Sequence, residues 1–207
     1  MSYQSIWFDT NLPEDIVDVL GKDLSKNFDE HVQKSKLQND VIDESKRNSY
    51  NAWIPTTHWV SGFLWHYVQK ANRENFLYDI SNVDGENIQY THYNPGEFYK
   101  WHIDAGIASC YSPTNILEDG KFKSNEDYVS EKCEMVRKLS FVLQLSDSEN
   151  YTGGNLQLLD ETDQSYFAPR KKGTIIIFDS RTKHRVLKVK SGLRKSLVGW
   201  VVGPRWR

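Results

Sequence analysis

The chain has 207 residues, of which 38% are hydrophobic and 13% aromatic. It can therefore bury a single core, and this composition argues against a disordered protein. The formal net charge is −2, but residues 170–207 carry twelve Lys and Arg against the single acid Asp179. Such a basic segment is compatible with nucleic-acid binding, and equally with a sheet whose inner face holds a small dianion.

The sequence favours a cytoplasmic protein. No apolar run approaches the roughly 18 residues of a membrane span, and the first residues lack the basic and then apolar pattern of a signal peptide. The two cysteines, Cys110 and Cys133, lie outside any CxxC motif and are expected to be free thiols in a reducing compartment.

Two amphipathic helices are predicted in the first part of the chain. Residues 13–28 open with a proline and two acids, as helices often do, and residues 59–80 again place apolar side chains at helical spacing. The apolar positions of the first helix are Ile16, Val19, Leu20 and Leu24, and those of the second are Phe63, Leu64, Tyr67, Val68 and Ala71. Residues 29–55 between the helices are polar and are expected to be irregular.

Two strands follow, at 87–93 and 98–104, joined by an Asn-Pro-Gly turn. Because side chains alternate along a strand, His102 and Asp104 project from the same face. Together they form half of the two-histidine, one-carboxylate triad that holds non-haem Fe(II). Tyr99 and Trp101 fall on the other face and are expected in the core beneath the helices, and His92 is expected to be structural.

Residues 105–137 are rich in Ser, Asn, Asp, Glu and Gly, and a connection of this length is expected to be a lid, a binding loop or disordered. Residues 138–146 then alternate between an apolar face and a more polar one, which is typical of a sandwich strand. Further short strands are predicted after the Gly153-Gly154 turn and at 165–168, 173–179, 185–190 and 194–202. The pattern predicts a mainly β protein, a sandwich or jelly roll with N-terminal helices packed on one sheet.

The third metal ligand is predicted at His184, which follows a buried strand and a polar turn. Arg194 stands ten residues further on, after the Ser191-Gly192 turn. If that turn closes a hairpin, Arg194 lies opposite a residue near position 189, roughly 16 Å along the strand from His184. A metal ion, a five-carbon diacid and an arginine side chain would fill this gap, although a bulge is needed to turn Arg194 to the same face as His184.

Three motifs give the chain a specific resemblance. They are Y-x-x-G-x-x-Y-x-x-H-x-D from Tyr93 to Asp104, Y-x-G-G-x-L from Tyr151, and H-R-V from His184 with an arginine ten residues after the histidine. Over about residues 87–202 the chain resembles the iron(II)- and 2-oxoglutarate-dependent dioxygenases of the prolyl 4-hydroxylase-like branch.

The resemblance implies a double-stranded β-helix (jelly-roll) core at about 87–202, supported by helices in about 1–86, within a single domain 1–207. It implies that His102, Asp104 and His184 bind Fe(II), and that Arg194, assisted by the Tyr93 hydroxyl, binds the distal carboxylate of 2-oxoglutarate. The resemblance also implies O2 as the oxidant and ascorbate as a reductant. The carboxylate of Asp104 favours hydroxylation over halogenation, on a prolyl or peptidyl group or a related small molecule.

Two alternatives stay open at this point. A non-catalytic cupin-like jelly roll that binds a metal or a sugar would also use two histidines and an aspartate, but it has no need of Arg194. A nucleic-acid demethylase would explain the basic segment, but its spacing between the second histidine and the arginine is shorter than ten.

Overall fold

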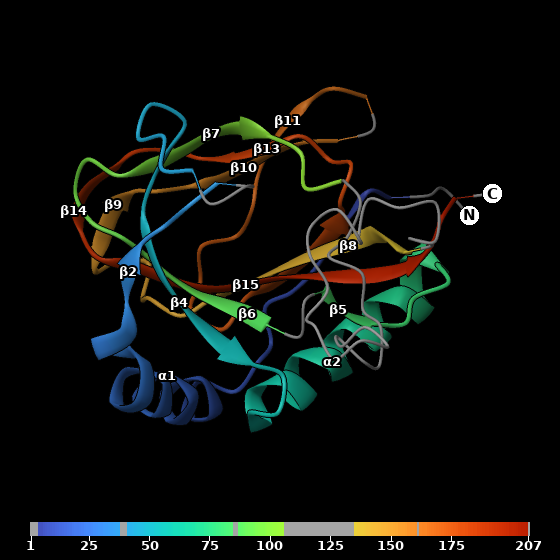
Figure 1. Ribbon diagram of the computed structural model, residues 1–207, viewed down its shortest axis with the longest axis horizontal. Helices are drawn as coiled ribbons and strands as arrows, with labels where there is room; N and C mark the ends of the chain where they lie inside the picture. The colour runs from blue at the N-terminus through green and yellow to red at the C-terminus, as the bar shows by residue number, and fades with distance from the viewer. Residues whose placement is uncertain (1–3, 38–40, 85–86, 106–134, 161, 207) are drawn as a thin grey trace, which may run out of the picture.

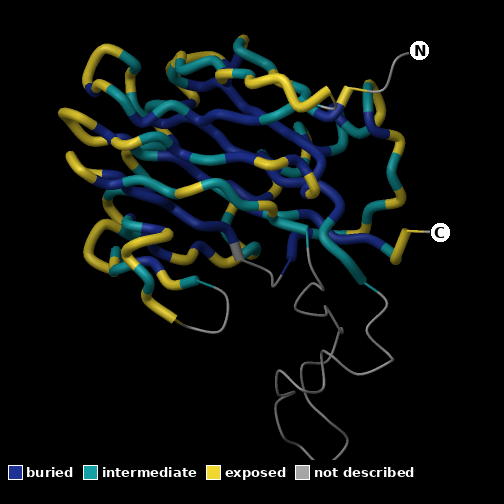
Figure 2. The backbone as a smooth tube through the Cα atoms, turned by 90° about the horizontal axis from the view of Figure 1, so that it is seen from above, coloured by how far each residue is buried: buried dark blue, intermediate teal, exposed yellow. Residues whose placement is uncertain are grey.

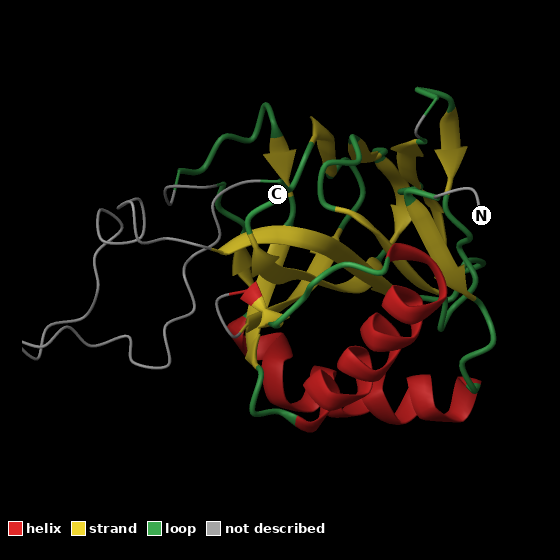
Figure 3. Ribbon diagram, turned by 90° about the vertical axis from the view of Figure 1, so that its right-hand side faces the viewer, coloured by secondary structure: helices red, strands yellow, loops and turns green. Residues whose placement is uncertain are grey.

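Two β-sheets face each other, and two helices cover the outer face of the larger sheet (Figures 1 and 3). The computed structural model of the chain describes residues 4–37, 41–84, 87–105, 135–160 and 162–206. Buried backbone runs through the strands, and exposed backbone gathers in the turns at the edges (Figure 2).

Both cysteines, and residues 106–134 of the predicted lid, lie outside the described part of the chain. Within that part, no helix has the length and apolar composition needed to cross a membrane.

The larger sheet contains strands from both ends of the chain. Among the described residues its order is β1 (Ile6–Asp9), β12 (Ile175–Asp179), β8 (Met135–Gln144), β15 (Arg194–Pro204), β6 (Asn87–Tyr93), β4 (Tyr50–Pro55) and β2 (Gln33–Lys34), with β5 (Asn82–Val83) also paired to β15. All of these pairings are antiparallel. The long strand β15 lies near the centre of this sheet.

The smaller sheet has the order β11 (Ser165–Phe167), β10 (Leu156–Leu159), β13 (His184–Val186), β7 (Phe98–His102) and β3 (Arg47–Asn48). A third pair joins β14 (Val189–Gly192) to β9 (Tyr151–Gly153). One face of the smaller sheet is turned toward the larger sheet, and the space between the two sheets contains the site described below.

Strand β8 shows why the sheets stack in this way. Its residues Leu139, Phe141 and Leu143 belong to the core that the helices complete, while Val142 belongs to a second core between the sheets. The predicted alternation of 138–146 is therefore confirmed. A strand with two differently lined faces has to be covered on both sides.

Helix α1 (Glu14–Phe28) lies where the sequence predicts it, but its buried side is slightly different. Val17, Leu20 and Leu24 are buried, whereas Ile16 and Val19 are 41% and 60% exposed. Val17 packs against the turn at Gly173, where a side chain would come within 3.0 Å of it. Val17 therefore belongs to the buried side of the helix, with Leu20 and Leu24.

Helix α2 (Trp59–Ala71) is shorter than the predicted 59–80. It continues as one π-helical turn, Asn72–Phe76, and ends at Leu77, whose backbone is left-handed with φ 55°. The Asn72 side chain accepts a hydrogen bond from the Tyr78 amide and donates one to the Tyr78 carbonyl, each 2.9 Å long. These bonds hold the chain in the turn that terminates the helix.

Several strand predictions need correction. The region 29–55 is not irregular throughout, because β4 pairs with β6 along its whole length. The predicted strand 185–190 divides into β13 and β14, which belong to different sheets. The Ser191-Gly192 turn does not close the hairpin considered from the sequence, since β14 pairs with β9 and Arg194 pairs with Tyr93 of β6.

Candidate functional site

Two histidines and an aspartate from distant parts of the chain converge between the sheets. His102 ends β7, His184 begins β13, and the two are direct partners across that strand pair. Asp104 follows β7, where its amide donates to the Ser180 carbonyl at 2.9 Å. One potential ligand atom from each of the three side chains lies within 4.8 Å of the others. The structure thus brings together the three residues that the sequence singles out.

The imidazoles are held with their Nε2 atoms toward the carboxylate. Nδ1 of His102 lies 2.8 Å from the Lys100 carbonyl, and Nδ1 of His184 lies 2.9 Å from the Thr182 carbonyl. Because a carbonyl oxygen can only accept, each Nδ1 donates, which leaves the Nε2 lone pair available to a metal. The Nε2 atoms lie 3.6 and 3.4 Å from Asp104 oxygens.

The protonation states also suit a divalent cation. Burial, with His184 nearby, lowers the pKa of His102 to about 4, so the imidazole is neutral at pH 7. Burial alone would raise the pKa of Asp104. The nearby His184 and His102 and the hydrogen bond from the Ser140 hydroxyl lower this pKa by a larger amount, so the net shift is downward. Ser140 Oγ donates to Asp104 Oδ2 at 2.8 Å. Two imidazoles that each present Nε2, together with one carboxylate, form the donor set expected of a non-haem Fe(II) site.

Arg194 lies in the same cavity as the three potential ligands. It is 1% exposed, its register partner Tyr93 is 3% exposed, and its guanidinium carbon lies 5.5 Å from the centre of the Tyr93 ring. Nη2 donates to Gln144 Oε1 at 3.0 Å and Nη1 donates to Ser196 Oγ at 3.3 Å. Arg194 Nε and Gln144 Nε2 are buried without a hydrogen-bond partner, so both donors remain for a ligand.

The cavity has an apolar side as well as a polar one. Val142, Leu156, Val186 and Val198 line it, and Thr91 contributes a buried hydroxyl without a hydrogen-bond partner. A short molecule with charged ends and a methylene chain would match this lining, because its carboxylate would meet donors and its carbons would meet apolar walls.

Residues 88–202, more than half of the chain, match the family model described as the 2OG-Fe(II) oxygenase superfamily. The chain belongs to this superfamily. All five predicted site residues, His102, Asp104, His184, Arg194 and Tyr93, fall within the matched region. Membership of the superfamily implies Fe(II), 2-oxoglutarate and O2 as cofactor and co-substrates.

Curated relatives within the superfamily are named PKHD-type hydroxylases. One from Synechococcus elongatus is 29% identical over 154 residues, which cover 73% of this chain and 59% of the relative. One from Crocosphaera subtropica is 44% identical over 116 residues, which cover 56% of this chain and 42% of the relative. The chain spans between 28% and 59% of the length of the curated relatives it matches.

Solved structures of prolyl hydroxylases share the fold. A Pseudomonas putida prolyl-4-hydroxylase matches with a TM-score of 0.68 and 20% identity, over 98% of this chain and 94% of the other. A Trichoplax adhaerens prolyl hydroxylase, solved with a hypoxia inducible factor peptide fragment, matches with a TM-score of 0.68 and 16% identity, over 95% and 83%. The predicted jelly-roll fold with helices on one sheet is therefore confirmed.

The expectation that Tyr99 lies in a core beneath the helices is wrong. Tyr99 lines the cavity, and its ring stacks on the His102 imidazole with centroids 3.6 Å apart and an interplanar angle of 17°. The pairing of β7 with β13 shifts register between His184 and Val186, so that Val186 lies opposite Tyr99. This bulge reverses the alternation and turns Tyr99 to the same side as His102. Trp101 lies instead beneath the Arg185 guanidinium, 4.5 Å away.

The sequence did not single out Ser140 and Gln144 as site residues. Ser140 contacts Asp104 and Gln144 contacts Arg194, so this one strand orients both ends of the site. The available signal was the polar face of β8, where Ser140, Val142 and Gln144 alternate with large apolar residues.

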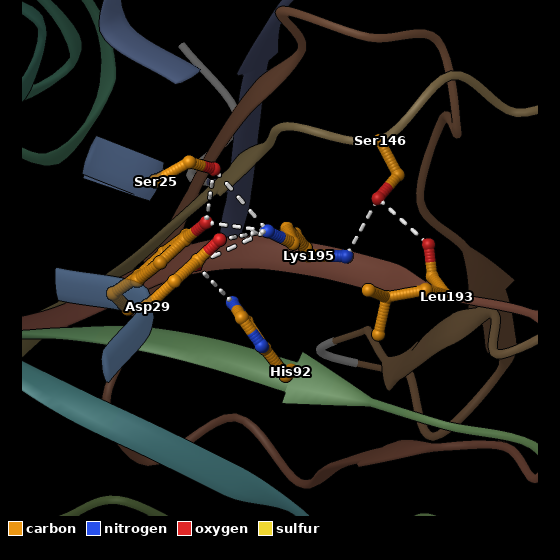
Figure 4. A network of polar contacts seen from close by, with 7 residues as sticks. Ser25, Asp29, His92, Ser146, Leu193 and Lys195 are labelled. Atoms are coloured by element: carbon orange, nitrogen blue, oxygen red, sulfur yellow. Dashed lines mark hydrogen bonds and ion pairs between the residues drawn. The ribbon is translucent and has the colours of Figure 1, made fainter. Parts of the chain in front are cut away.

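The reverse side of the Tyr93 and Arg194 pair carries a separate polar network (Figure 4). His92 and Lys195, the neighbours of that pair in sequence, are also register partners and point toward the end of α1. Lys195 Nζ contacts Tyr90 Oη at 2.9 Å and Asp29 at 3.2 Å. His92 is thus turned away from the candidate site, as strand alternation predicts.

Proposed function

We propose that the chain is an Fe(II)- and 2-oxoglutarate-dependent dioxygenase that hydroxylates a C–H bond of a prolyl or peptidyl group or a related substrate. The overall change would convert the substrate C–H, O2 and 2-oxoglutarate into the substrate C–OH, succinate and CO2. One observation carries the proposal: the cavity contains both three potential metal ligands and a buried arginine whose Nε has no hydrogen-bond partner.

His102, Asp104 and His184 would hold the metal ion. Their fit rests on the fixed Nδ1 hydrogen bonds, which direct both Nε2 lone pairs toward the Asp104 carboxylate. Ser140 would keep that carboxylate oriented and ionised. When bound, Fe(II) supplies the oxidative chemistry that couples decarboxylation of 2-oxoglutarate to hydroxylation.

Arg194 would bind the carboxylate of 2-oxoglutarate that is remote from the metal. A guanidinium can form two charge-assisted hydrogen bonds with a carboxylate, and Gln144 and Ser196 fix its plane. The Tyr93 hydroxyl would add a further donor. The apolar walls at Val142, Leu156 and Val186 would contact the methylene groups and exclude water.

A prolyl or peptidyl substrate is supported by the names of the structural neighbours and by the peptide bound to the Trichoplax adhaerens enzyme. Ascorbate would act as the reductant that returns oxidised iron to Fe(II). Incubation with a peptide library, Fe(II), ascorbate and 2-oxoglutarate, followed by mass spectrometry, would identify a product that has gained one oxygen atom.

A thermal-shift experiment tests the cofactor requirement without knowledge of the substrate. Mn(II) and 2-oxoglutarate added together should raise the melting temperature by more than the sum of their separate effects, because each completes the binding site of the other. His184→Ala should abolish the synergy. Purely additive shifts in the unsubstituted protein would rule out the proposed arrangement of metal and co-substrate.

A further inference from the structure

Arg47 is a second buried arginine in the wall of the same cavity. It is 6% exposed and belongs to β3, the short edge strand of the smaller sheet, where it pairs with Tyr99 of β7. Residue 47 lies outside the region matched by the superfamily model, which begins at residue 88. None of the sequence motifs includes Arg47, so its position in the cavity wall is seen only in the structure.

The Arg47 guanidinium is fixed by neutral groups. Nε donates to Ser49 Oγ at 2.8 Å and Nη2 donates to Gln89 Oε1 at 3.0 Å, with a longer contact of 3.5 Å from Nη1 to the Lys36 carbonyl. Because Gln89 belongs to β6, Arg47 connects the edge of the smaller sheet to the larger sheet. In the part of the chain that the structure describes, no carboxylate forms an ion pair with this guanidinium.

An aromatic ring adjoins the cation instead of an acid. The guanidinium carbon lies 4.9 Å from the centre of the Tyr99 ring, within the range of a cation–π contact. The Tyr99 ring in turn stacks on His102 at 3.6 Å. Arg47, Tyr99 and His102 therefore form a continuous series of contacts from the fixed guanidinium to the imidazole.

His102 depends on this support more than His184 does. The His184 side chain is 7% exposed and lies against the Phe178 ring, whose centre is 4.7 Å away. The His102 side chain is 18% exposed, and on its outer side β7 is paired, among the described residues, with the two-residue strand β3 alone. Besides the Tyr99 ring, the His102 ring is restrained by the Lys100 carbonyl and by the His184 ring, whose centre is 4.1 Å away.

We propose that Arg47 is a positioning residue for the metal centre. It acts through the Tyr99 ring, which holds the His102 imidazole with Nε2 toward Asp104. The inference rests on the proposed function, because it requires that His102 binds the metal. Its physical basis is that outer contacts that orient a ligating histidine raise the affinity of the site for the metal.

The test measures the affinity of the purified chain for Mn(II) by electron paramagnetic resonance, with stability and circular dichroism recorded for each variant. Arg47→Met, which keeps the aliphatic stem and removes the cation, should weaken Mn(II) binding about 10-fold. Arg47→Lys, which keeps a cation near the ring, should stay within roughly three-fold of the unsubstituted protein. In a Tyr99→Leu background, Arg47→Met should no longer weaken Mn(II) binding, because the intermediary is gone.

Arg170→Met is the matched control. Arg170 also lies over a tyrosine ring, 4.4 Å from Tyr151, and donates to backbone carbonyls. The Arg170→Met variant should be less stable than the unsubstituted protein but should bind Mn(II) with unchanged affinity. If Arg47→Met does not fold, Ser49→Ala, which removes the acceptor of Arg47 Nε, replaces it and should weaken Mn(II) binding roughly three-fold.

Two outcomes would overturn the inference while leaving the proposed function intact. The first is an Mn(II) affinity equal to that of the unsubstituted protein in a folded Arg47→Met variant, or in the Ser49→Ala variant if that one replaces it. The second is an equal loss of Mn(II) affinity on Arg47→Met with Tyr99 present and with Tyr99→Leu. Failure of the unsubstituted protein to bind Mn(II) at all would instead contradict the proposed function.

Discussion

Arg194 has a buried positive charge without a matching acid. At 1% exposure its hydrogen-bond partners are an amide oxygen and a hydroxyl, and no ion pair to it is found among the described residues. A buried charge that lacks a counter-ion is unfavourable. Binding of an anion in the cavity would offset that cost, which is why this residue discriminates an oxygenase from a simple metal-binding jelly roll.

Arg194→Lys should weaken 2-oxoglutarate binding by about 10- to 100-fold, because an ammonium cannot reproduce two parallel hydrogen bonds to one carboxylate. Mn(II) affinity should change by less than about two-fold, since the residue does not contact the ligand set. Calorimetric titration of Mn(II), and then of 2-oxoglutarate into the Mn(II)-loaded protein, measures both. Equal loss of the two affinities would show that Arg194 supports the metal centre instead.

At the residue scale, the sequence predicts which potential metal ligands come together but does not predict the residues that support them. His102, Asp104, His184 and Arg194 stand out by chemical type and spacing, and the structure brings them to one cavity. Tyr99 could not be placed correctly, because the bulge that reverses its side depends on the pairing of β7 with β13. A register shift between strands 82 residues apart leaves no local signal.

Among the elements, the end of β9 leaves no room for a side chain at Gly153. Gly153 has φ +72°, and a side chain there would approach the Lys188 carbonyl oxygen to 2.3 Å. In the pairing of β9 with β14, Gly153 is the partner of Val189. This glycine is therefore required both by the backbone conformation and by the adjacent strand.

Gly153→Ala should lower the free energy of unfolding by at least about 3 kcal/mol, since it combines a left-handed alanine with a clash against backbone. Gly96→Ala is the matched control. Gly96 has φ +93°, and a methyl group added there would meet no atom within 4 Å, so only the conformational cost of about 1 to 2 kcal/mol applies. Urea unfolding of the two variants measures the difference, and similar losses would contradict the role of the clash.

At the element scale, the alternation of apolar and polar residues predicts a strand correctly where the flanking turns are clear. The strand at 87–93 and the two faces of 138–146 follow from pattern alone. Strand β4 was missed because its polar neighbours obscure the apolar residues Ala52 and Ile54, which are buried. The hairpin considered after β14 does not form, although sequence proximity favours a local partner, because β15 finds its partners in β6 and β8.

At the scale of the whole molecule, some basic residues of the C-terminal segment form ion pairs with acidic residues near the N-terminus. Lys172 pairs with Asp18 of α1, and Lys195 of β15 pairs with Asp29 just after α1. The basic C-terminal segment thus meets acids of the N-terminal helix that covers the same sheet. Exposed pairs of this kind contribute little to stability individually, but the buried groups beside Lys195 make the junction sensitive to pH.

His92 is the titratable group that gives this junction its pH dependence. It is 9% exposed, its ring lies edge-on to Tyr90 with centroids 4.5 Å apart, and Tyr50 is its partner on β4. Burial, and then the Lys195 ammonium, lower the pKa of His92 to about 4, against an opposing contribution from Asp29. Its Nε2 lies 3.7 Å from Asp29 and has no hydrogen-bond partner.

Stability should therefore fall as the pH is lowered from about 6.5 to about 4, because the unfolded chain binds a proton on His92 that the folded chain excludes. The contribution of His92 over this window is below about 3.4 kcal/mol, the product of the pKa shift and 1.36 kcal/mol per unit. His92→Gln removes the titration and keeps a neutral polar side chain, so its unfolding free energy should decline less steeply below pH 6.5. Urea unfolding at pH 7, 5.5 and 4.5 measures the two slopes. Parallel slopes would mean that His92 is protonated in the folded protein, held by Asp29 in spite of Lys195.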